Sequence, residues 1–208
     1  MQLGNPMSVA PSAPPVRDDS VFLPQFRSPG LPDGLHWGPH NGNCGPTSIV
    51  NALRLVGLDM PGFRGERTQS VIDAARVLAT GENDHTRATT KQQQAFALRA
   101  AGAHVETTRS LPEGLRAVRE GAVLLIGGNR AGAGWPRRPD DPPATGVSAH
   151  AAVVARWVPE TDRYVVFDPA LFAPVHVDAT QLAAFTQVTD GAQMLRLGLV
   201  VTNPASPA

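Results

Sequence analysis

The sequence predicts an α+β fold, with an N-terminal helical half packed on a C-terminal antiparallel β-sheet half. Between residues 44 and 119, apolar side chains recur mainly at the three- and four-residue spacing of amphipathic helices. From residue 122 onward, the pattern changes to short apolar runs, two of which flank a polar turn at residues 160–163. Helices followed by strands along the chain are typical of the α+β class.

The helices of the first half are delimited by residues that start or stop helices. Pro46 suits the first helical position, and Gly57 ends the same helix. Ser110 and Glu113 have the spacing of a capping box, which predicts a helix start. The expected helices cover residues 46–56, 68–78, 90–101 and 110–119, with a short strand at residues 103–107.

The second half is expected to form strands, because its apolar runs are short and rich in Val, Ile and Leu. The turn at residues 160–163 joins two of these runs into a hairpin. Asp178 can cap one short helix among the strands. The expected strands cover residues 122–126, 149–158, 164–167, 174–177 and 194–201, and the helix covers residues 178–185.

The 208 residues suit one folded domain with additional terminal segments. Residues 1–34 are rich in Pro, Ser and Gly and are predicted to be a flexible arm or linker. The folded domain is expected at residues 35–202, followed by a short tail at residues 203–208. A linker, a targeting segment read by a secretion machine and a propeptide all fit the arm. The arm carries four apolar residues that can anchor it on the domain, namely Val21, Phe22, Leu23 and Phe26.

The charge pattern argues against nucleic acid as a partner, since the formal net charge is zero and no Lys/Arg-rich run is present. No stretch approaches the roughly 20 apolar residues of a membrane span. The first 20 residues also lack the basic and apolar regions of an ordinary secretory signal. We therefore expect a protein that is cytoplasmic or is secreted by a non-Sec route.

Cys44 is the only cysteine of the chain and lies in the segment Asn-Cys-Gly-Pro-Thr-Ser-Ile. A single cysteine forms no internal disulfide and is short of partners for a thiolate metal site. At a helix start, its sulfur faces unpaired N–H groups and the positive end of the helix dipole, and both favour the thiolate. A nucleophile and a small buried apolar residue both fit this motif when it is taken alone.

A cysteine nucleophile needs a base and a group that orients the base. His150 opens an apolar strand, and Asp168 ends the returning strand of the predicted hairpin just before Pro169. With Thr161 and Asp162 at the hairpin tip, His150 and Asp168 lie near its open end. As neighbours on adjacent strands, the carboxylate can hold the imidazole in one tautomer.

These residues resemble the papain-like cysteine peptidases, in particular their C39-like branch. The resemblance rests on the Cys44-Gly-Pro-Thr-Ser block, on the strand that opens with His150, and on the strand that ends in Asp168-Pro169. It covers roughly residues 35–202. It implies a helical half that carries the nucleophile, a sheet half that carries His and Asp, and substrate in the cleft between them.

One position departs from that family. A Gln six residues before the nucleophile usually donates to the oxyanion in the superfamily, and here Gly38 stands at that position. The nearby donors are His40, Asn41 and Asn43, of which Asn41 is preferred because its amide can replace that of Gln. Loss of one oxyanion donor costs on the order of 10² to 10³ in rate, so a working enzyme needs a substitute.

Two further residues are candidates for substrate binding. Asn43 directly precedes the nucleophile, and Trp135 lies in a Gly- and Pro-rich segment at residues 127–147. This segment is interpreted as a flap over the substrate, although a plain surface loop fits equally well.

No metal and no organic cofactor is expected. His36 and His40 have the four-residue spacing of metal ligands on a helix, but Gly38 and Pro39 between them argue against a helix there. The glycines at residues 127–134 lead into a Pro-rich run instead of a helix, which argues against a phosphate-binding loop.

The predicted function is hydrolysis of a peptide or isopeptide bond by a thiol-dependent cysteine peptidase. Its catalytic residues are Cys44 as nucleophile, His150 as base and acid, Asp168 as orienting group and Asn41 at the oxyanion. The same triad serves a glutamine deamidase or transglutaminase-like effector toxin and a peptidoglycan amidase. A catalytically inactive papain-like binding module also stays open. The partner is a protein or peptide substrate, and the arm is compatible with delivery by a bacterial secretion or toxin system.

Overall fold

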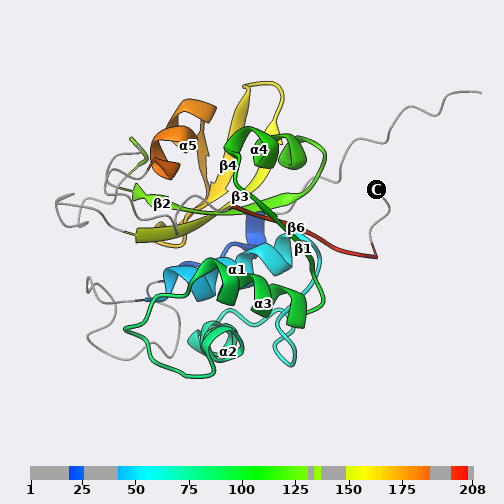
Figure 1. Cartoon of the computed structure of the whole chain (residues 1–208), viewed down its shortest axis with the longest axis vertical. Coiled ribbons are helices and arrows are strands. Elements are labelled where there is room, and N and C mark those ends of the chain that lie inside the picture. The colour runs from blue at the N-terminus through cyan, green and yellow to red at the C-terminus, as the bar shows by residue number, and fades with distance from the viewer. Residues whose placement is uncertain (1–18, 26–41, 131–133, 137–148, 188–197, 206–208) are drawn as a thin grey trace, which may run out of the picture.

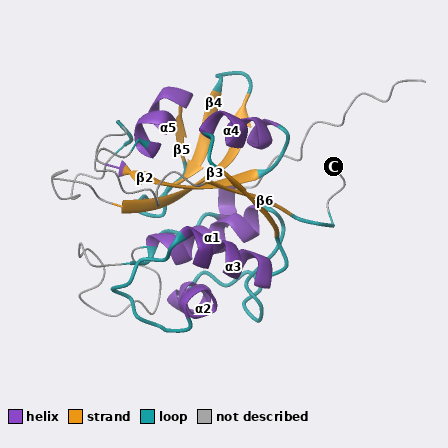
Figure 2. Cartoon of the chain, viewed as in Figure 1, coloured by secondary structure: helices purple, strands orange, loops and turns teal. Residues whose placement is uncertain are grey.

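The computed structural model describes residues 19–25, 42–130, 134–136, 149–187 and 198–205. The predicted α+β class is confirmed, since helices predominate in the first half and the strands form one sheet (Figures 1 and 2). The elements in chain order are η1 (Asp19–Val21), α1 (Cys44–Leu55), α2 (Gln69–Thr80), α3 (Lys91–Ala100), β1 (His104–Thr108), α4 (Leu111–Arg119), β2 (Val123–Asn129), β3 (Ala149–Val158), β4 (Arg163–Phe167), β5 (Val175–Val177), α5 (Ala179–Thr186) and β6 (Gly198–Thr202).

The strands are antiparallel and lie in the order β1-β6-β2-β3-β4-β5. Helices α1 and α3 cover one face of this sheet, α2 packs on the side of α1 and α3 that faces away from the sheet, and α4 and α5 cover the other face (Figure 1). The β3–β4 hairpin has the expected turn, and Asp162 at its tip has a φ of 50°. None of the helices in the described part of the chain is long and apolar enough to cross a membrane.

Alternating residues of the central strands supply an apolar core on each face of the sheet. On the side of α1, Val153 and Phe167 are buried together with Leu53 and other apolar residues of the first half. On the side of α5, Val154 of the same strand packs with Leu182 and Phe185. This period-two pattern explains why β3 reads as a continuous apolar run, since both of its faces are covered.

Helix α1 begins at Cys44, two residues before the predicted start at Pro46. Pro46 therefore lies in the first turn, where its missing N–H is tolerated because those groups have no partner within a helix. The helix ends as predicted: Gly57 has a φ of 76°, and the N–H of Leu58 donates to the carbonyl of Leu53 at 2.9 Å. Because Cys44 is the first residue of α1, its sulfur lies at the N-terminus of this helix.

Residues 19–25 fall within the predicted arm and pack on the domain. Phe22 and Leu23 are buried, as expected of anchoring residues, whereas Phe26 lies outside the described residues. The side chain of Asn51 in α1 accepts from the N–H of Leu23 at 2.8 Å and donates to its carbonyl at 2.9 Å. The ring of Phe22 meets that of Phe167 edge-on at 5.2 Å. The segment thereby joins α1 to the end of β4.

Strand β2 extends to Asn129, three residues beyond the predicted end at Ile126. Gly127 and Gly128, expected in a flap, pair instead with Ala151 and His150 of β3. Gly128 has a packing reason, because a Cβ at this position would lie 2.1 Å from the carbonyl oxygen of Phe185.

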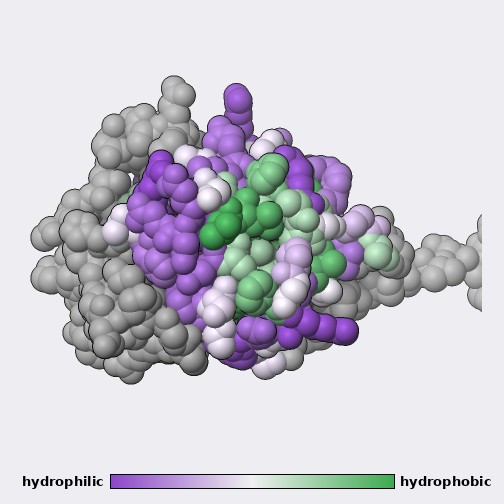
Figure 3. All heavy atoms as spheres, turned by 90° about the horizontal axis from the view of Figure 1, so that it is seen from below, coloured by the Kyte–Doolittle hydropathy of each residue, from purple (hydrophilic) through white to green (hydrophobic). Residues whose placement is uncertain are grey.

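Exposed apolar side chains occur on the helical side of the molecule. Val77 of α2 is 44% exposed and Phe96 of α3 is 60% exposed. Figure 3 views the molecule from the side of these helices, where apolar side chains gather next to a hydrophilic area. Single exposed apolar residues are ordinary on protein surfaces.

Candidate active site

The sulfur of Cys44 lies at the start of α1, against the beginning of β3. It is partly exposed and forms a hydrogen bond with the side chain of His150. Burial raises the pKa of the thiol. The hydrogen bond and charge of His150, together with the backbone N–H groups of Ala151 and Gly45, outweigh burial and hold the pKa of Cys44 below its usual value.

The imidazole of His150 lies between the sulfur and a carboxylate. Its Nε2 is 2.6 Å from Oδ1 of Asp168, and because an ionised carboxylate only accepts, Nε2 carries the proton. Nδ1 is then the ring nitrogen that remains for the sulfur of Cys44. Burial lowers the pKa of His150, but the charge and hydrogen bond of Asp168 and the contact with Cys44 raise it to about 10.

Asp168 is completely buried directly after β4. Burial raises the pKa of its carboxyl, but the charge and hydrogen bond of His150 and the charge of Arg130 hold the pKa below its usual value. The N–H of Ala170 donates to Oδ1 at 2.8 Å, and Nε of Arg130 donates to Oδ2 at 2.9 Å. Both oxygens therefore have partners, and the carboxylate has a fixed orientation.

Arg130 is not among the site residues predicted from the sequence. This residue directly follows β2, the strand that pairs with β3, and its side chain also donates to the carbonyl of Pro136 at 3.2 Å. Its position after the Gly-Gly-Asn end of a strand next to the His150 strand is the signal that could have identified it.

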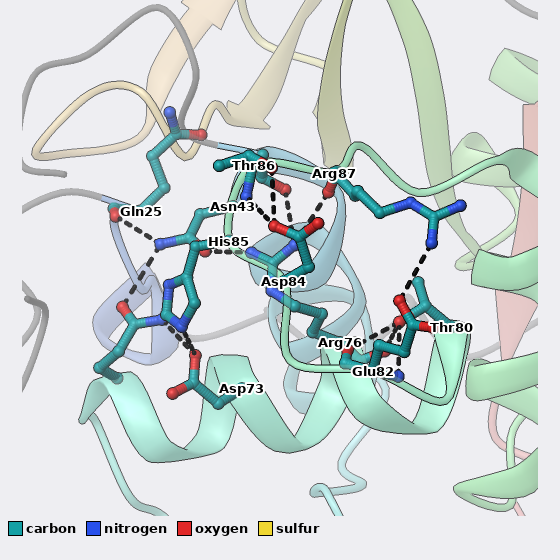
Figure 4. Close-up of polar contacts among 12 residues, drawn as sticks. Gln25, Asn43, Asp73, Arg76, Thr80, Glu82, Asp84, His85, Thr86 and Arg87 are labelled. Carbon is teal, nitrogen blue, oxygen red and sulfur yellow. Dashed lines mark hydrogen bonds and ion pairs between the residues drawn. The ribbon is translucent and has the colours of Figure 1, made fainter.

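A buried arginine supports the two residues before the nucleophile (Figure 4). Arg76 of α2 is completely buried, and its guanidinium donates to Oδ1 of Asn43 and to the carbonyl of Gly42. It also donates to the carbonyl of Arg87 at 2.9 Å. Five N–H donors in a rigid plane allow a single arginine to hold several oxygens of two segments at once.

The loop before α3 packs against Gly42. The N–H of Gly42 donates to the carbonyl of His85 at 2.7 Å. A Cβ on Gly42 would lie 2.3 Å from the carbonyl oxygen of Arg87, so only glycine permits this approach. The contacts from α2 and from this loop therefore define the path of the backbone into Cys44 (Figure 4).

The other candidates fall in different places. Asn43 is completely buried, and its amide also donates to the carbonyl of Gln25 and to Oε1 of Gln69, both at 3.4 Å. It therefore supports the chain before Cys44 and presents no surface to a substrate. Asn41, the preferred oxyanion donor, lies outside the described residues, as does His40.

Trp135 packs in the core on the α5 side of the sheet. It is 4% exposed, and its ring stacks on that of Phe185 with centroids 4.3 Å apart. Phe185 in turn meets the ring of His150 edge-on at 6.4 Å. The expected contact of Trp135 with substrate is thus replaced by a packing contact, because burying the apolar surface of the indole is more favourable than leaving it exposed to water on a flap.

Comparisons with known proteins bear on the fold. No protein-family model matches the chain, and no curated protein sequence matches it. A structure described as a C39-like peptidase from Bacillus anthracis superposes with a TM-score of 0.53 and 14% identity, covering 90% of this chain and 96% of the other. The fold is that of the C39-like peptidases.

Two further solved structures are similar to the chain. One is a double glycine motif protease from an AMS/PCAT transporter in complex with the leader peptide, with a TM-score of 0.46, 15% identity and coverage of 77% of this chain and 84% of the other. The second is the peptidase domain of Streptococcus ComA, a bi-functional ABC transporter, with a TM-score of 0.48, 12% identity and coverage of 77% and 91%.

Proposed function

We propose that this protein is a cysteine peptidase that hydrolyses a peptide or isopeptide bond in a protein or peptide substrate. One observation carries the proposal: the imidazole of His150 forms a hydrogen bond with the sulfur of Cys44, the only cysteine of the chain, and lies 2.6 Å from the buried carboxylate of Asp168. The low pKa of the thiol and the raised pKa of the imidazole favour an ion pair of thiolate and imidazolium.

In the proposed first half-reaction, the thiolate of Cys44 attacks the carbonyl carbon, and the carbonyl oxygen takes up the displaced electron pair. His150 then gives the proton on Nδ1 to the leaving nitrogen as the C–N bond breaks. An amine leaves, and a thioester with Cys44 remains. Asp168 keeps the ring oriented and the proton on Nε2 throughout.

Water completes the reaction in the second half. His150, now neutral, takes a proton from water, and the oxygen attacks the thioester carbonyl. When the C–S bond breaks, the acid product leaves and the ion pair of thiolate and imidazolium is restored. The backbone N–H of Cys44 is the proposed oxyanion donor, because first-turn N–H groups have no partner in the helix, and Asn41 is the proposed second donor.

Covalent labelling tests the proposal. Purified protein is treated with a peptidyl vinyl sulfone and, separately, with a glutamine-mimic chloroketone, and the adduct is located by mass spectrometry. We expect a stoichiometric adduct on Cys44 of the folded protein at neutral pH and none in the Cys44→Ala variant. Labelling should also fall in His150→Ala, which retains the sulfur but lacks the imidazole. An unlabelled Cys44 would contradict the proposal.

Product analysis then separates the chemistries that share a thioester. A peptidase produces new amine termini in a peptide library, and the Cys44→Ala variant does not. Conversion of a side-chain amide to a carboxyl without chain cleavage would assign a glutamine deamidase. Loss of turbidity of purified cell walls would assign a peptidoglycan amidase.

A further inference from the structure

Lys91 lies at the end of α3 that packs against the residue after the candidate nucleophile, although 47 positions separate Lys91 from Cys44 in the sequence. It is the first residue of α3, directly after the Thr90 cap. This end of α3 packs on the residue that follows Cys44, because a Cβ on Gly45 would lie 1.9 Å from Oγ1 of Thr89 and 2.8 Å from Nε2 of Gln94. Because Gly45 has no side chain, the start of α3 can pack this closely against α1.

The ammonium group of Lys91 is buried without a hydrogen-bond partner among the described residues. Lys91 is 7% exposed, and its Nζ is inaccessible to solvent. A buried cation without compensation is costly, so an anion is expected near it. Cys44 is the anionic group that acts on Lys91 in the described part of the chain.

We infer that Lys91 is a second cation of the active centre, which stabilises the negative charge of the Cys44 thiolate from the side of α3 while His150 does so from β3. This role rests on the proposed chemistry of Cys44. It gives the buried ammonium a partner that exists only when the sulfur has lost its proton. Within the described residues, no acidic side chain forms a hydrogen bond with the ammonium.

A lysine suits this position in a way that an arginine does not. Burial lowers the pKa of Lys91 to about 7, whereas the charge of Cys44 raises it. A guanidinium keeps its proton at any physiological pH, but an ammonium adjusts its charge to its surroundings. Below about pH 7, Lys91 carries its charge, and the thiolate is favoured in the range where an ordinary cysteine is protonated.

The alkylation rate of Cys44 by iodoacetamide, measured against pH, tests this inference without any substrate. The variants are Lys91→Met, which keeps an apolar stem of similar length, and Arg116→Met, which removes one positive charge from the exposed face of α4. His150 acts on the charge of Cys44, and the charge of Cys44 acts on Arg76; both variants retain these two residues.

We expect Lys91→Met to raise the pH midpoint of alkylation by roughly one unit, so that the rate at lower pH falls about tenfold. Arg116→Met should leave the midpoint in place. The midpoint of Lys91→Met coinciding with that of the unaltered protein would overturn the inference. Because alkylation needs no peptide, this result is independent of whether peptide hydrolysis is observed.

A reciprocal measurement leaves Lys91 in place. Because Lys91 is the only lysine of the chain, protein grown with ¹³C-labelled lysine gives a single side-chain signal in NMR spectra. If the ammonium stabilises the thiolate, the thiolate stabilises the ammonium equally. The pKa of Lys91 should therefore be lower in Cys44→Ser than in the unaltered protein. Identical titration curves of the two proteins would overturn the inference even if Lys91→Met fails to fold.

Discussion

Nε of Arg130 donates a hydrogen bond at 2.9 Å to the Asp168 oxygen that His150 does not contact. The carboxylate is completely buried, and the arginine side chain is 13% exposed. Asp168 thus has a cation on each oxygen, one from the end of β2 and one from β3. A buried carboxylate held in this way stays ionised, which the proposed role of orienting His150 requires.

Removal of this arginine should destabilise the fold. In Arg130→Met, Asp168 loses one of two cationic partners, and we expect the free energy of unfolding to fall by roughly 3 kcal/mol. Urea denaturation measures this change. The matched control is Arg87→Met, because Arg87 pairs with Glu82 at 3.0 Å while both side chains are 63% exposed. That variant should lose less than about 1 kcal/mol, and equal losses in the two variants would contradict the argument.

Peptide hydrolysis should be active over a plateau that includes neutral pH. The reactive pair has a deprotonated Cys44 and a protonated His150. It is lost as the pH falls through the lowered pKa of Cys44, and it is lost as the pH rises through the pKa of His150 at about 10. A pH profile of kcat/KM, measured on a peptide that the protein cleaves, should show both limbs.

The alkaline limb depends on the carboxylate. Asp168→Asn removes the charge that raises the pKa of His150, so this limb should move to lower pH while the acid limb persists. If the alkaline limb of Asp168→Asn stays in place, a group other than His150 controls it.

The pair of His150 and Asp168 could be predicted because the hairpin that joins them is local. A turn with Thr161 and Asp162 and two apolar runs of known direction are enough to bring both residues to one end of the hairpin. The order of the sheet could not be predicted in the same way, since β6 lies between β1 and β2. Such pairings between distant segments leave no local signal.

The supporting residues were missed for a related reason. Arg76 lies on a helix, where an arginine is usually an exposed surface residue. Only the packing of α1 and of residues 84–87 against Arg76 buries it and gives its guanidinium several acceptors. Trp135 shows the opposite error. Its Gly- and Pro-rich surroundings indicate a surface loop, but its ring stacks on that of Phe185, a contact that the local sequence does not predict. Both outcomes depend on contacts across elements.

The buried hydrogen bonds of Arg76 lead to a prediction for Cys44. In Arg76→Met, the side chain of Asn43 and the carbonyl of Gly42 lose a buried donor, so the fold should lose roughly 3 kcal/mol. Because these groups direct the chain into α1, alkylation of Cys44 should also slow. Denaturation and iodoacetamide labelling measure the two effects.

Arg64→Met provides the control for Arg76→Met, since Arg64 is exposed and the substitution removes the same charge. It should change neither quantity appreciably. An Arg76→Met protein that is less stable but is alkylated at an unchanged rate would show that Arg76 supports the fold without positioning the sulfur.

The close approach of α5 to β2 gives a prediction that concerns His150. Gly128 pairs with His150 across the strands, and a Cβ on Gly128 would lie 2.1 Å from the carbonyl oxygen of Phe185 and 2.4 Å from its ring. Since backbone cannot rotate away, Gly128→Ala must displace this part of α5 and with it the ring that meets His150 edge-on. We expect a loss of roughly 1–3 kcal/mol in stability together with lower kcat/KM.

Gly114→Ala on α4 separates this effect from the mere addition of a methyl group. There the new Cβ would lie 2.7 Å and 2.9 Å from the two terminal methyl groups of the buried Leu124, so this side chain must shift, and the gain of about 1 kcal/mol for alanine over glycine within a helix offsets that cost. We therefore expect stability and kcat/KM close to those of the unaltered protein. Because Gly128 pairs with His150 and contacts Phe185, whereas Gly114 contacts Leu124, only the Gly128→Ala variant should alter hydrolysis. Unchanged hydrolysis in that variant would mean that Phe185 does not position His150.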